Sequence, residues 1–515
     1  MDNKQGFLEK PTQSYWIAST EGTNYPGVKE NIKVDALIAG GGITGISCAY
    51  LLKKEGLKVA LLEADGISKG ATGHTTAKIS SQHRLIYSRL IQQFGEEKAQ
   101  QYAQANERAI LEIKNIVKEN NIDCDLMDRS AFVYTEKEEN IQKIEEEARA
   151  ASGMGIKTSF TEETGLPFPV KAALRFDGQA QFHPRKYLLA LTKLIAGEGS
   201  HVFEDSKIVQ VQEGPPYKVL TAEGVEITAD QVIIATHYPL TGRVLPYVVK
   251  LYADRSYIIA VKAKKPFPPG MYLRAEYPGR SLRSQPFEGG ELILVGGENH
   301  KTGQEVNAVE RYKNLVNFAE KTFQVEEVPY RWSTQDYRTM DGVPFIGHYS
   351  SATPQKYVAT GFGKWGMTNG TAAGLIIRDL IVKGESPWQE VYDPMRRTFR
   401  QSIKRFFIEN LNVASHFVKG KIYRGEKEVE LEKGQGKVLN IEGKRKGAYR
   451  DEEGKLYLVD ATCTHLGCEL NWNSAEKSWD CPCHGARFTY KGEVIEGPVM
   501  KPLRVKKTDK KETKG

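Results

Sequence analysis

The chain has few cysteines and no long apolar run. Six cysteines among 515 residues are too few for a secreted fold that depends on disulfides. No apolar stretch reaches the roughly 18–20 residues that a membrane-spanning helix needs. The opening residues, MDNKQGFLEKPTQ, contain no apolar core of a secretory signal. We therefore expect a cytoplasmic protein without a transmembrane segment.

The chain also lacks a patch of one charge. The formal net charge is +7, but acidic and basic residues are interspersed along the sequence. The densest basic run, VKKTDKKETKG, contains no aromatic residue that could stack on a base. We expect residues 507–515 to be a solvated basic tail, and we expect no nucleic-acid partner.

The N-terminal region has the pattern of a dinucleotide site. The apolar run KVDALIAG, residues 33–40, predicts a buried parallel strand, and GGGITG and the helical pattern ISCAYLLKKEG follow it. A second apolar run, KVALLE, ends at Glu63. Gly40 permits a tight turn, Gly42 lets the backbone approach a pyrophosphate, and Gly45 allows close helix–strand packing. Glu63 can accept hydrogen bonds from a ribose. The alternative is a plain glycine turn with an exposed glutamate.

A second G-x-G-x-x-G, GFGKWG at 361–366, also lies between a predicted strand and a predicted helix. The helix after it ends at VKGESPW, and no apolar strand with a terminal acid follows. The half of the unit that would bind a ribose is therefore missing. We expect one bound nucleotide and no NAD domain.

The order of these segments, with DQVIIATHYP, RTMDGVPFIG and KYVATGFGKWGMTNG, resembles the D-amino-acid-oxidase-like family of FAD-dependent oxidoreductases over residues 14–395. The resemblance implies an α/β, Rossmann-like FAD-binding domain at about 30–83, 184–245 and 330–385. It implies an interleaved α+β substrate domain at about 84–183 and 246–329. Within these parts we expect long helices at 84–119 and 136–151 and strands near 168–183 and 247–325. A helical linker at 396–424 follows.

The same resemblance implies where FAD binds. A helix N-terminus after GFGK would face the pyrimidine end of the flavin and favour its anionic reduced form. Some relatives attach the flavin covalently through a histidine in a loop like KGATGHTTAK, although His74 could equally be an ordinary loop residue. The expected FAD-binding residues are Gly40, Gly42, Thr44, Gly45, Glu63, Thr72, His74, Thr75, Ile208, Ala235, Thr236, Gly363, Lys364, Gly366, Met367 and Thr368.

Four of the six cysteines lie close together, in CTHLGC at 463–468 and CPCHGARF at 481–488. Each box offers one cysteine and one histidine, C-x-H and C-x-x-H. Zinc is the rival metal, but zinc fingers usually pair cysteine with cysteine in one box and histidine with histidine in the other. One thiolate and one imidazole from each box is the set that a two-iron cluster with two cysteines on one iron and two histidines on the other needs.

The two boxes resemble those of an all-β Rieske [2Fe–2S] domain, here over residues 425–506. The resemblance implies that Cys463 and Cys481 hold one iron and that His465 and His484 hold the other. It also implies a disulfide between Cys468 and Cys483, the alternative being two free thiols in a reducing cytoplasm.

High-potential members of that group have hydroxyl-bearing residues where this chain has Ala486 and Phe488. Hydroxyl groups there hydrogen-bond to cluster sulfur and stabilise the reduced state. Without them we expect a lower reduction potential within the Rieske range.

Together the two resemblances predict an enzyme. We expect a dehydrogenase that oxidises an amine or amino-acid-like substrate and passes electrons singly through the cluster to an external acceptor, a redox protein or a quinone. A flavin/iron–sulfur electron carrier, or a reductase with electrons entering through the cluster, is the alternative. A Rieske oxygenase would need a mononuclear iron site with a closely spaced histidine pair and an acid, which the sequence lacks outside the cluster boxes.

Catalytic residues cannot be assigned from the sequence. Arg338, Tyr257 and Arg283 could each meet a substrate carboxylate, but surface or structural roles would explain them equally.

Overall fold

The structure is a computed structural model whose described residues are 11–239, 245–304, 307–396, 408, 410–413, 415–416, 431–441 and 443–505. Contacts within the chain divide it into two units. The first consists of Met1–Arg243, Ser256–Asn299 and Tyr312–Gln401, and the second of Val244–Arg255, His300–Arg311 and Ser402–Gly515. The expected linker, 396–424, lies mostly outside the described residues, and the basic tail, 507–515, lies wholly outside them.

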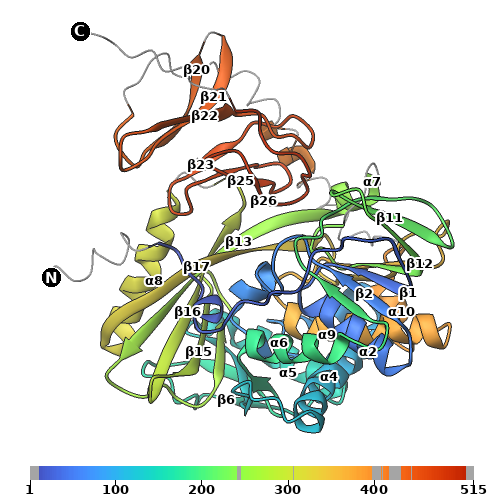
Figure 1. Cartoon of the computed structure of the whole chain (residues 1–515). Helices are drawn as coiled ribbons and strands as arrows, with labels where there is room; N and C mark the ends of the chain where they lie inside the picture. The colour runs from blue at the N-terminus through green and yellow to red at the C-terminus, as the bar shows by residue number, and fades with distance from the viewer. Residues whose placement is uncertain are drawn as a thin grey trace, which may run out of the picture. The chain divides into compact units, whose positions relative to one another are not determined.

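An eight-stranded sheet forms one half of the first unit (Figure 1). Its core is parallel: β1 pairs with β2 on one side and with β12 on the other. The run VDALIA makes β1 a buried strand, because burial is nearly continuous from Val34 to its end. In spatial order the strands are β10 (Ile208–Val211), β11 (Tyr217–Thr221), β12 (Glu226–Ile234), β1 (Ile32–Ala39), β2 (Val59–Leu62) and β9 (His201–Phe203), with β19 (Lys356–Thr360) beside β12 and β18 (Phe345–His348) beside β19.

A second eight-stranded sheet is mostly antiparallel where its pairing is described. Its order is β17 (Val325–Thr339), β13 (Leu251–Ala263), β16 (Gly290–Lys301), β15 (Arg280–Phe287), β14 (Met271–Arg274), β5 (Ala131–Thr135), β7 (Ala172–Phe176) and β6 (Thr158–Thr161). A small sheet contains β3 (Lys78–Ile79), β8 (Ala180–Gln181) and β4 (Met127–Asp128).

The expectation of strands throughout 247–325 is wrong at two places. Residues Leu245–Lys250 form the short helix α7, and Ala308–Phe323 form the helix α8. In α8 the buried side chains Tyr312, Leu315 and Ala319 are three or four residues apart. That spacing is the helical period, and it places one apolar face on the core.

The helix expected at 84–119 is two helices, α3 (Tyr87–Phe94) and α4 (Glu96–Glu119). They separate at Gly95, whose φ of +83° is a left-handed conformation that glycine adopts without strain. The other helices of the unit are α1 (Tyr15–Ala18), α2 (Ile43–Lys54), α5 (Ile141–Gly153), α6 (Pro184–Ile195), α9 (Gly366–Val382) and α10 (Gln389–Tyr392), with 3₁₀ turns η3 (Ala71–His74) and η4 (Glu138–Asn140).

Small residues let α9 lie directly on α2. A Cβ atom at Gly370 would come within 2.9 Å of Thr44 Oγ1, and one at Gly374 within 3.0 Å of Ser47 Cβ. This close packing holds the N-terminal turn of α9 near the N-terminal turn of α2, although more than 300 residues separate them in the sequence.

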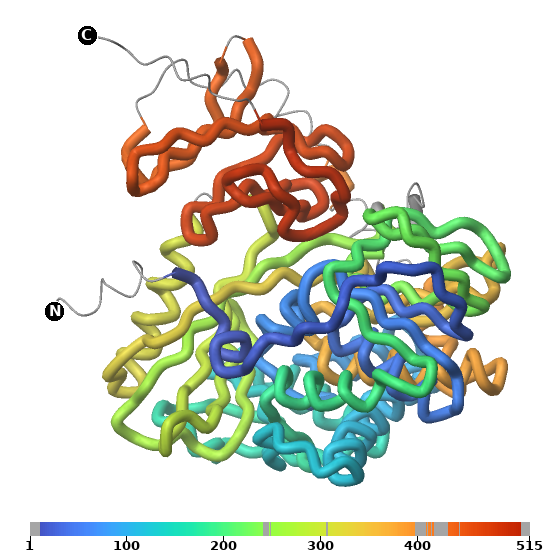
Figure 2. The backbone as a smooth tube through the Cα atoms, viewed as in Figure 1, coloured from blue at the N-terminus to red at the C-terminus, as the bar shows by residue number. Residues whose placement is uncertain are grey.

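The segment before β1 runs along the edge of the first sheet (Figure 2). Thr23 donates a hydrogen bond to the carboxylate of Glu204, the backbone N–H of Tyr25 donates to the same carboxylate at 3.0 Å, and the N–H of Val28 donates to Ser206 Oγ at 3.0 Å. These bonds fasten the segment to the loop after β9.

The second unit has two small antiparallel sheets. One contains β20 (Gly436–Ile441), β21 (Lys444–Arg450) and β22 (Leu456–Asp460). The other contains β23 (Asn471–Asn473), β24 (Ser478–Asp480), β25 (Arg487–Thr489) and β26 (Val494–Glu496). Trp479 and Phe488 are fully buried in their common core with the cysteines of both boxes.

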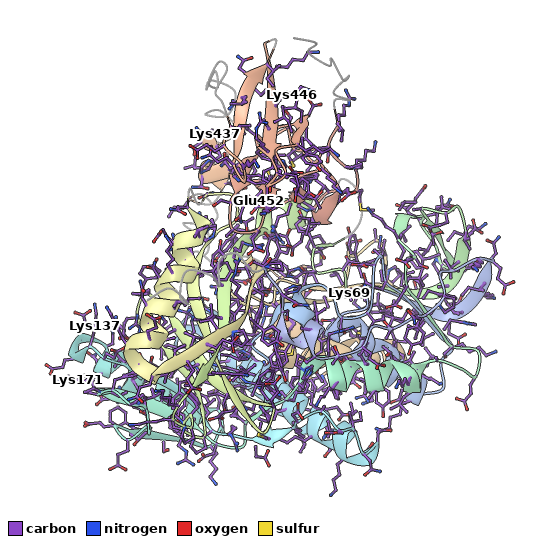
Figure 3. The ribbon with its side chains drawn as sticks, turned by 60° about the vertical axis from the view of Figure 1, so that its left-hand side comes forward. Lys69, Lys137, Lys171, Lys437, Lys446 and Glu452 are labelled. Carbon is purple, nitrogen blue, oxygen red and sulfur yellow. A yellow bond between two sulfur atoms is a disulfide. The ribbon has the colours of Figure 1, made fainter. Side chains whose placement is uncertain are left out.

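Charged side chains on the surface are paired locally. Figure 3 labels five lysines, of which Lys69 lies 3.4 Å from Asp65 and Lys171 lies 2.8 Å from Glu138, while Lys446 pairs with Asp460. Among the helices of the described residues, none combines the length and the apolar composition that crossing a bilayer requires.

Candidate functional site

The turn between β1 and α2 requires glycine at two positions. Gly40 has φ +108°, and a Cβ atom on it would lie 2.6 Å from Ala235 O. A Cβ atom on Gly45 would lie 1.9 Å from Gly40 O. The first turn of α2 therefore sits directly on the end of β1. The positive end of the helix dipole at this turn favours an anion such as a pyrophosphate.

Glu63 and Thr72 lie at the same turn. Glu63 follows β2, and its carboxylate accepts the backbone N–H of Gly41 at 2.6 Å and that of Asp65 at 3.1 Å. Burial raises the pKa of Glu63 above its ordinary value, although these hydrogen bonds act in the opposite direction. Thr72 Oγ1 accepts the N–H of Ile43 at 3.1 Å. The donor and acceptor set of a nucleotide site is thus gathered at one end of the sheet.

Three further residues of the expected FAD set lie in or directly after other strands of the same sheet. The backbone N–H of Ala235 donates to Ala39 O at 2.9 Å, so Ala235 and Thr236 follow β12 at the level of the glycine turn. Ile208 is buried at the start of β10. Ser206 lies two residues before Ile208, and its backbone N–H donates a hydrogen bond to Glu63 O at 2.9 Å.

The loop KGATGHTTAK is held by the indoles of two tryptophans. Trp332 Nε1 donates to His74 O at 2.9 Å, and Trp16 Nε1 donates to Thr75 O at 2.7 Å. The His74 ring nitrogen Nδ1 lies 2.9 Å from Gly70 O, within the same loop.

Two basic side chains, Lys78 and Arg283, make hydrogen bonds at the end of this loop. The Arg283 guanidinium donates to Ala77 O at 2.7 Å and to Thr76 O at 3.2 Å. Its other donors reach Ser284 O, Phe182 O and the Gln285 side chain, so it clamps the loop rather than presenting a free edge to a carboxylate. Lys78 Nζ donates to Tyr272 O at 2.8 Å, and burial holds the pKa of Lys78 well below its ordinary value.

A buried histidine, His83, connects the loop region to α9. Its Nδ1 lies 2.5 Å from Tyr102 Oη, and its Nε2 lies 3.1 Å from Thr368 Oγ1. Thr368 Oγ1 donates to Ser80 O at 3.0 Å, so it accepts the proton on Nε2, and Nδ1 accepts the tyrosine hydroxyl. Burial lowers the pKa of His83 to about 3, and the imidazole is neutral. Its ring also stacks on Trp365, with 4.7 Å between centroids.

The segment 361–368 presents the N-terminus of the 17-residue helix α9. Gly363 and Lys364 both have positive φ, and the N–H of Gly363 donates to Tyr337 O at 3.0 Å. Nothing lies within 4 Å of the position that a Cβ atom on Gly366 would occupy. An open helix N-terminus beside buried Met367 and Thr368 fits the pyrimidine end of a flavin.

The two cysteine–histidine boxes meet in the second unit. The Cys463 and Cys481 thiols are buried and hydrogen-bonded to each other. That hydrogen bond lowers the pKa of Cys463 and raises that of Cys481. One thiol of the pair therefore gives up its proton more easily and the other less easily than a free cysteine, and metal binding would deprotonate both.

The rings of His465 and His484 lie 5.1 Å apart at 87°. Burial lowers the pKa of His465, and burial together with His465 lowers the pKa of His484 to about 4. Both imidazoles are therefore neutral at pH 7 and able to bind a metal. Two thiols and two neutral imidazoles, one of each from either loop, fit a Rieske cluster.

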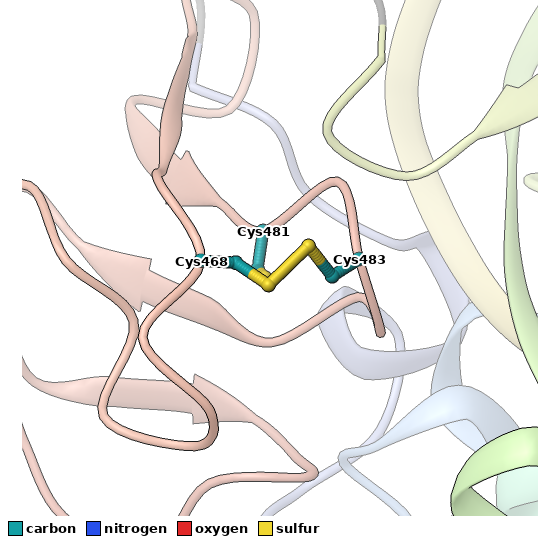
Figure 4. A group of neighbouring side chains, drawn as sticks. All are labelled: Cys468, Cys481 and Cys483. Atoms are coloured by element: carbon teal, nitrogen blue, oxygen red, sulfur yellow. A yellow bond between two sulfur atoms is a disulfide. The ribbon is translucent and has the colours of Figure 1, made fainter. Parts of the chain in front are cut away.

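Cys468 and Cys483 are joined by a disulfide, with 6.5 Å between their Cα atoms (Figure 4). The sulfur of Cys481 lies within 4.8 Å of both disulfide sulfurs. A sulfur in a disulfide offers no thiolate, so this trio is not a metal site of its own. The disulfide ties the two boxes together beside Cys481.

A buried ion pair supports the second box. Asp480 accepts Arg487 Nε at 3.0 Å, Ser478 Oγ at 2.8 Å and Asn473 Nδ2 at 2.9 Å. Burial alone would raise the pKa of Asp480, but Arg487 and these donors hold it below its ordinary value. The residue before Cys481 is therefore fixed as a carboxylate in a satisfied network.

No motif in the sequence marks His83, because its partners Tyr102 and Thr368 come from helices far away in the chain. Lys78 ends the loop KGATGHTTAK and Arg283 was considered for a substrate carboxylate, but the sequence does not show the hydrogen bonds that they make at this loop. Of the other two residues considered for a substrate carboxylate, Tyr257 is buried edge-on against Tyr312. Arg338 lies against the backbone of Gly363, beside the loop that precedes α9.

Known proteins resemble the two parts of the chain. The family described as FAD dependent oxidoreductase matches residues 35–380, and the family described as Rieske [2Fe-2S] domain matches residues 422–507. A protein of Bacillus subtilis (strain 168) named for a Rieske 2Fe-2S iron–sulfur centre, YhfW, is 41% identical over 501 residues, 97% of this chain and 98% of its own length.

Two more distant relatives cover the first part alone. Gamma-glutamylputrescine oxidoreductase of Escherichia coli (strain K12) is 24% identical over 389 residues, 73% of this chain and 90% of its own. The crystal structure of glycine oxidase from Geobacillus kaustophilus has a TM-score of 0.60 at 20% identity, covering 71% of this chain and 99% of its own. That likeness concerns the fold.

Proposed function

We propose that this chain, which belongs to the FAD-dependent oxidoreductase family and carries a C-terminal Rieske [2Fe-2S] domain, is a dehydrogenase for an amine or amino-acid-like substrate that passes electrons to an external acceptor one at a time. The observation that carries the proposal is the complete ligand set of Cys463, His465, Cys481 and His484 on the same chain as the dinucleotide turn. An oxidase that reduces O₂ directly has no need of a one-electron centre.

Bound FAD supplies a two-electron oxidant, and a bound [2Fe–2S] cluster supplies a one-electron carrier. The substrate loses two electrons and two protons as its C–N single bond becomes an imine. The acceptor, a redox protein or a quinone, takes up the electrons singly, and the protons pass to solvent. Supporting the substrate class, relatives of this fold carry the names glycine oxidase and gamma-glutamylputrescine oxidoreductase.

The residues of this chain have separate tasks in that scheme. Glu63, Thr72 and the turn at Gly40–Gly45 would hold the nucleotide end of FAD. The N-terminus of α9, fastened through Thr368 and His83, would lie at the flavin pyrimidine and favour negative charge there. We take an organic substrate rather than NADH as the electron donor, because no apolar strand with a terminal acid follows GFGKWG in the sequence. We also propose the cytoplasm as the site of action.

The test is turnover under anaerobic conditions. Amines and amino acids are screened for bleaching of the flavin absorbance, with NADH as a comparison, and those that bleach it are assayed with a one-electron dye as acceptor. We expect turnover with the dye in the native protein and at least tenfold slower turnover in Cys463→Ser with FAD bound. No bleaching by any amine or amino acid would contradict the substrate class. Equal turnover in both proteins would contradict the route through the cluster.

A further inference from the structure

The second unit takes in a short segment from far upstream in the sequence. Residues His300–Arg311 belong to this unit, although they fall inside the range that matches the FAD-dependent family. The described part of the segment makes a turn after β16, in which the N–H of Gln304 donates to Lys301 O at 3.2 Å. Thr302 and Gly303 in this turn are buried.

The turn is hydrogen-bonded to the second cluster box. Gln304 Nε2 donates to Pro482 O, the residue after the ligand Cys481, at 3.2 Å. Asn471 Nδ2, at the start of β23, donates to Gly303 O at 2.7 Å. Gln304 Nε2 also reaches Asn412 Oδ1 at 2.6 Å. Side-chain amides therefore connect the turn with Pro482 of the second box and with the start of β23.

Backbone meets backbone at Gly303. A Cβ atom there would lie 2.6 Å from the carbonyl carbon of Cys481 and 2.6 Å from the nitrogen of Pro482. Neither atom belongs to a flexible side chain, so any side chain at position 303 must displace the ligand loop. Gly303 also has φ +72°, which glycine adopts without strain.

We propose that the turn Thr302–Gln304 is a positioning element of the iron–sulfur site: it fixes the peptide between Cys481 and Pro482 and thereby the thiolate that Cys481 gives to the cluster. The site is then not complete within the Rieske-family range. Backbone orientation near a ligand sulfur sets its hydrogen bonds and exposure, which tune the cluster. The turn directly follows β16, so a segment outside the Rieske-family range holds the ligand loop.

The decisive comparison uses two glycines with the same backbone conformation in the full-length holoprotein. Gly443, in the turn between β20 and β21, has φ +74° and nothing within 4 Å of its Cβ position. Gly303→Ala and Gly443→Ala therefore impose the same φ strain, and only the first pushes on the ligand loop. Gln304→Ala removes the hydrogen bond to Pro482 without crowding.

The readouts are the EPR g values of the dithionite-reduced protein, the cluster midpoint potential, and iron retained after gel filtration. We expect G303A to shift the g values and the potential and to retain at most half of the iron that G443A retains. Q304A should shift the potential in the same direction by less. These measurements need no substrate, so they are independent of the proposed dehydrogenase activity.

Identical g values, potential and iron content in G303A and G443A would overturn the proposal. If G303A does not fold, Q304A decides: a spectrum and potential unchanged from the native protein would overturn it.

Discussion

The two proposed cofactor sites are built in opposite ways. The proposed FAD site consists largely of backbone: a glycine turn after β1, strand ends after β2 and β12, and a helix N-terminus at Gly366, gathered from more than 300 residues of chain. The proposed cluster site consists of side chains within the two boxes 463–468 and 481–488. A site made from side chains at short spacing fails when one ligand is removed. A site made from backbone fails when its packing is disturbed.

The largest expected effect is the loss of one cofactor while the other stays bound. Cys481→Ser should abolish iron binding, because a cluster iron loses one of its two thiolates, and should leave FAD content unchanged. Iron analysis and flavin absorbance on the same purified sample measure both. Loss of FAD together with the iron would show that the two sites do not assemble independently.

The second change disturbs the backbone packing of the turn between β1 and α2, where we expect FAD to bind. Gly45→Ala brings a methyl group to 1.9 Å from Gly40 O, and we expect a loss of about 1–3 kcal/mol or more in unfolding free energy together with loss of bound FAD. Denaturant melts and flavin content test this. Gly22→Ala, with nothing within 4 Å of its Cβ position, is the control. If G45A keeps its FAD, the close packing at Gly45 is not required for FAD binding and this prediction is wrong.

A smaller effect is expected at His83. His83→Ala removes two buried hydrogen bonds, each worth roughly 0.5–1.5 kcal/mol, and frees the first turn of α9. FAD affinity, measured by fluorescence of the released flavin, should fall roughly tenfold, with a shift in the flavin absorbance. His201→Ala, in β9, should change neither. An unaltered flavin spectrum in H83A would remove His83 from the site.

The pH dependence of FAD binding is a further test of the proposed FAD site. Burial raises the pKa of Glu63, so its carboxylate is protonated at a higher pH than that of an exposed glutamate. A protonated Glu63 accepts a ribose hydroxyl poorly, and FAD affinity should fall as the pH drops through the raised pKa. Glu63→Gln should bind FAD more weakly and lose that dependence. An unchanged pH profile in E63Q would assign the effect to another group.

The smallest effect tunes the cluster without disturbing its ligands. Ala486 and Phe488 are fully buried within the second box. They occupy the positions at which high-potential members carry hydroxyl groups, so Phe488→Tyr adds one such hydroxyl and should raise the midpoint potential. We expect the native value in the lower part of the Rieske range of about −150 to +300 mV. A native midpoint above about +200 mV would contradict this.

The same contrast explains how much could be predicted from the sequence. The motifs predicted both families, the Rieske domain and the FAD-dependent oxidoreductase, and both are confirmed. The cluster ligands, inferred from residue types at short spacing, stay a prediction. The disulfide between Cys468 and Cys483 is present as the resemblance implied.

What could not be predicted depends on distant contacts. Nothing in SSQHRL marks His83 as the partner of Thr368, and nothing in KTGQ marks Gly303 as a neighbour of Cys481. The helix α8 is a different case. The apolar spacing of Tyr312, Leu315 and Ala319 is helical and can be read from the sequence. The family arrangement of strands on either side of α8 favours a strand there instead.

The most direct test of the account is an EPR measurement after anaerobic mixing of the native protein with a substrate that bleaches its flavin. Electron transfer between the two centres predicts the signal of a reduced, histidine-ligated [2Fe–2S] cluster, lost in Cys463→Ser. A bleached flavin beside a cluster that stays oxidised, although dithionite reduces it, would contradict the account.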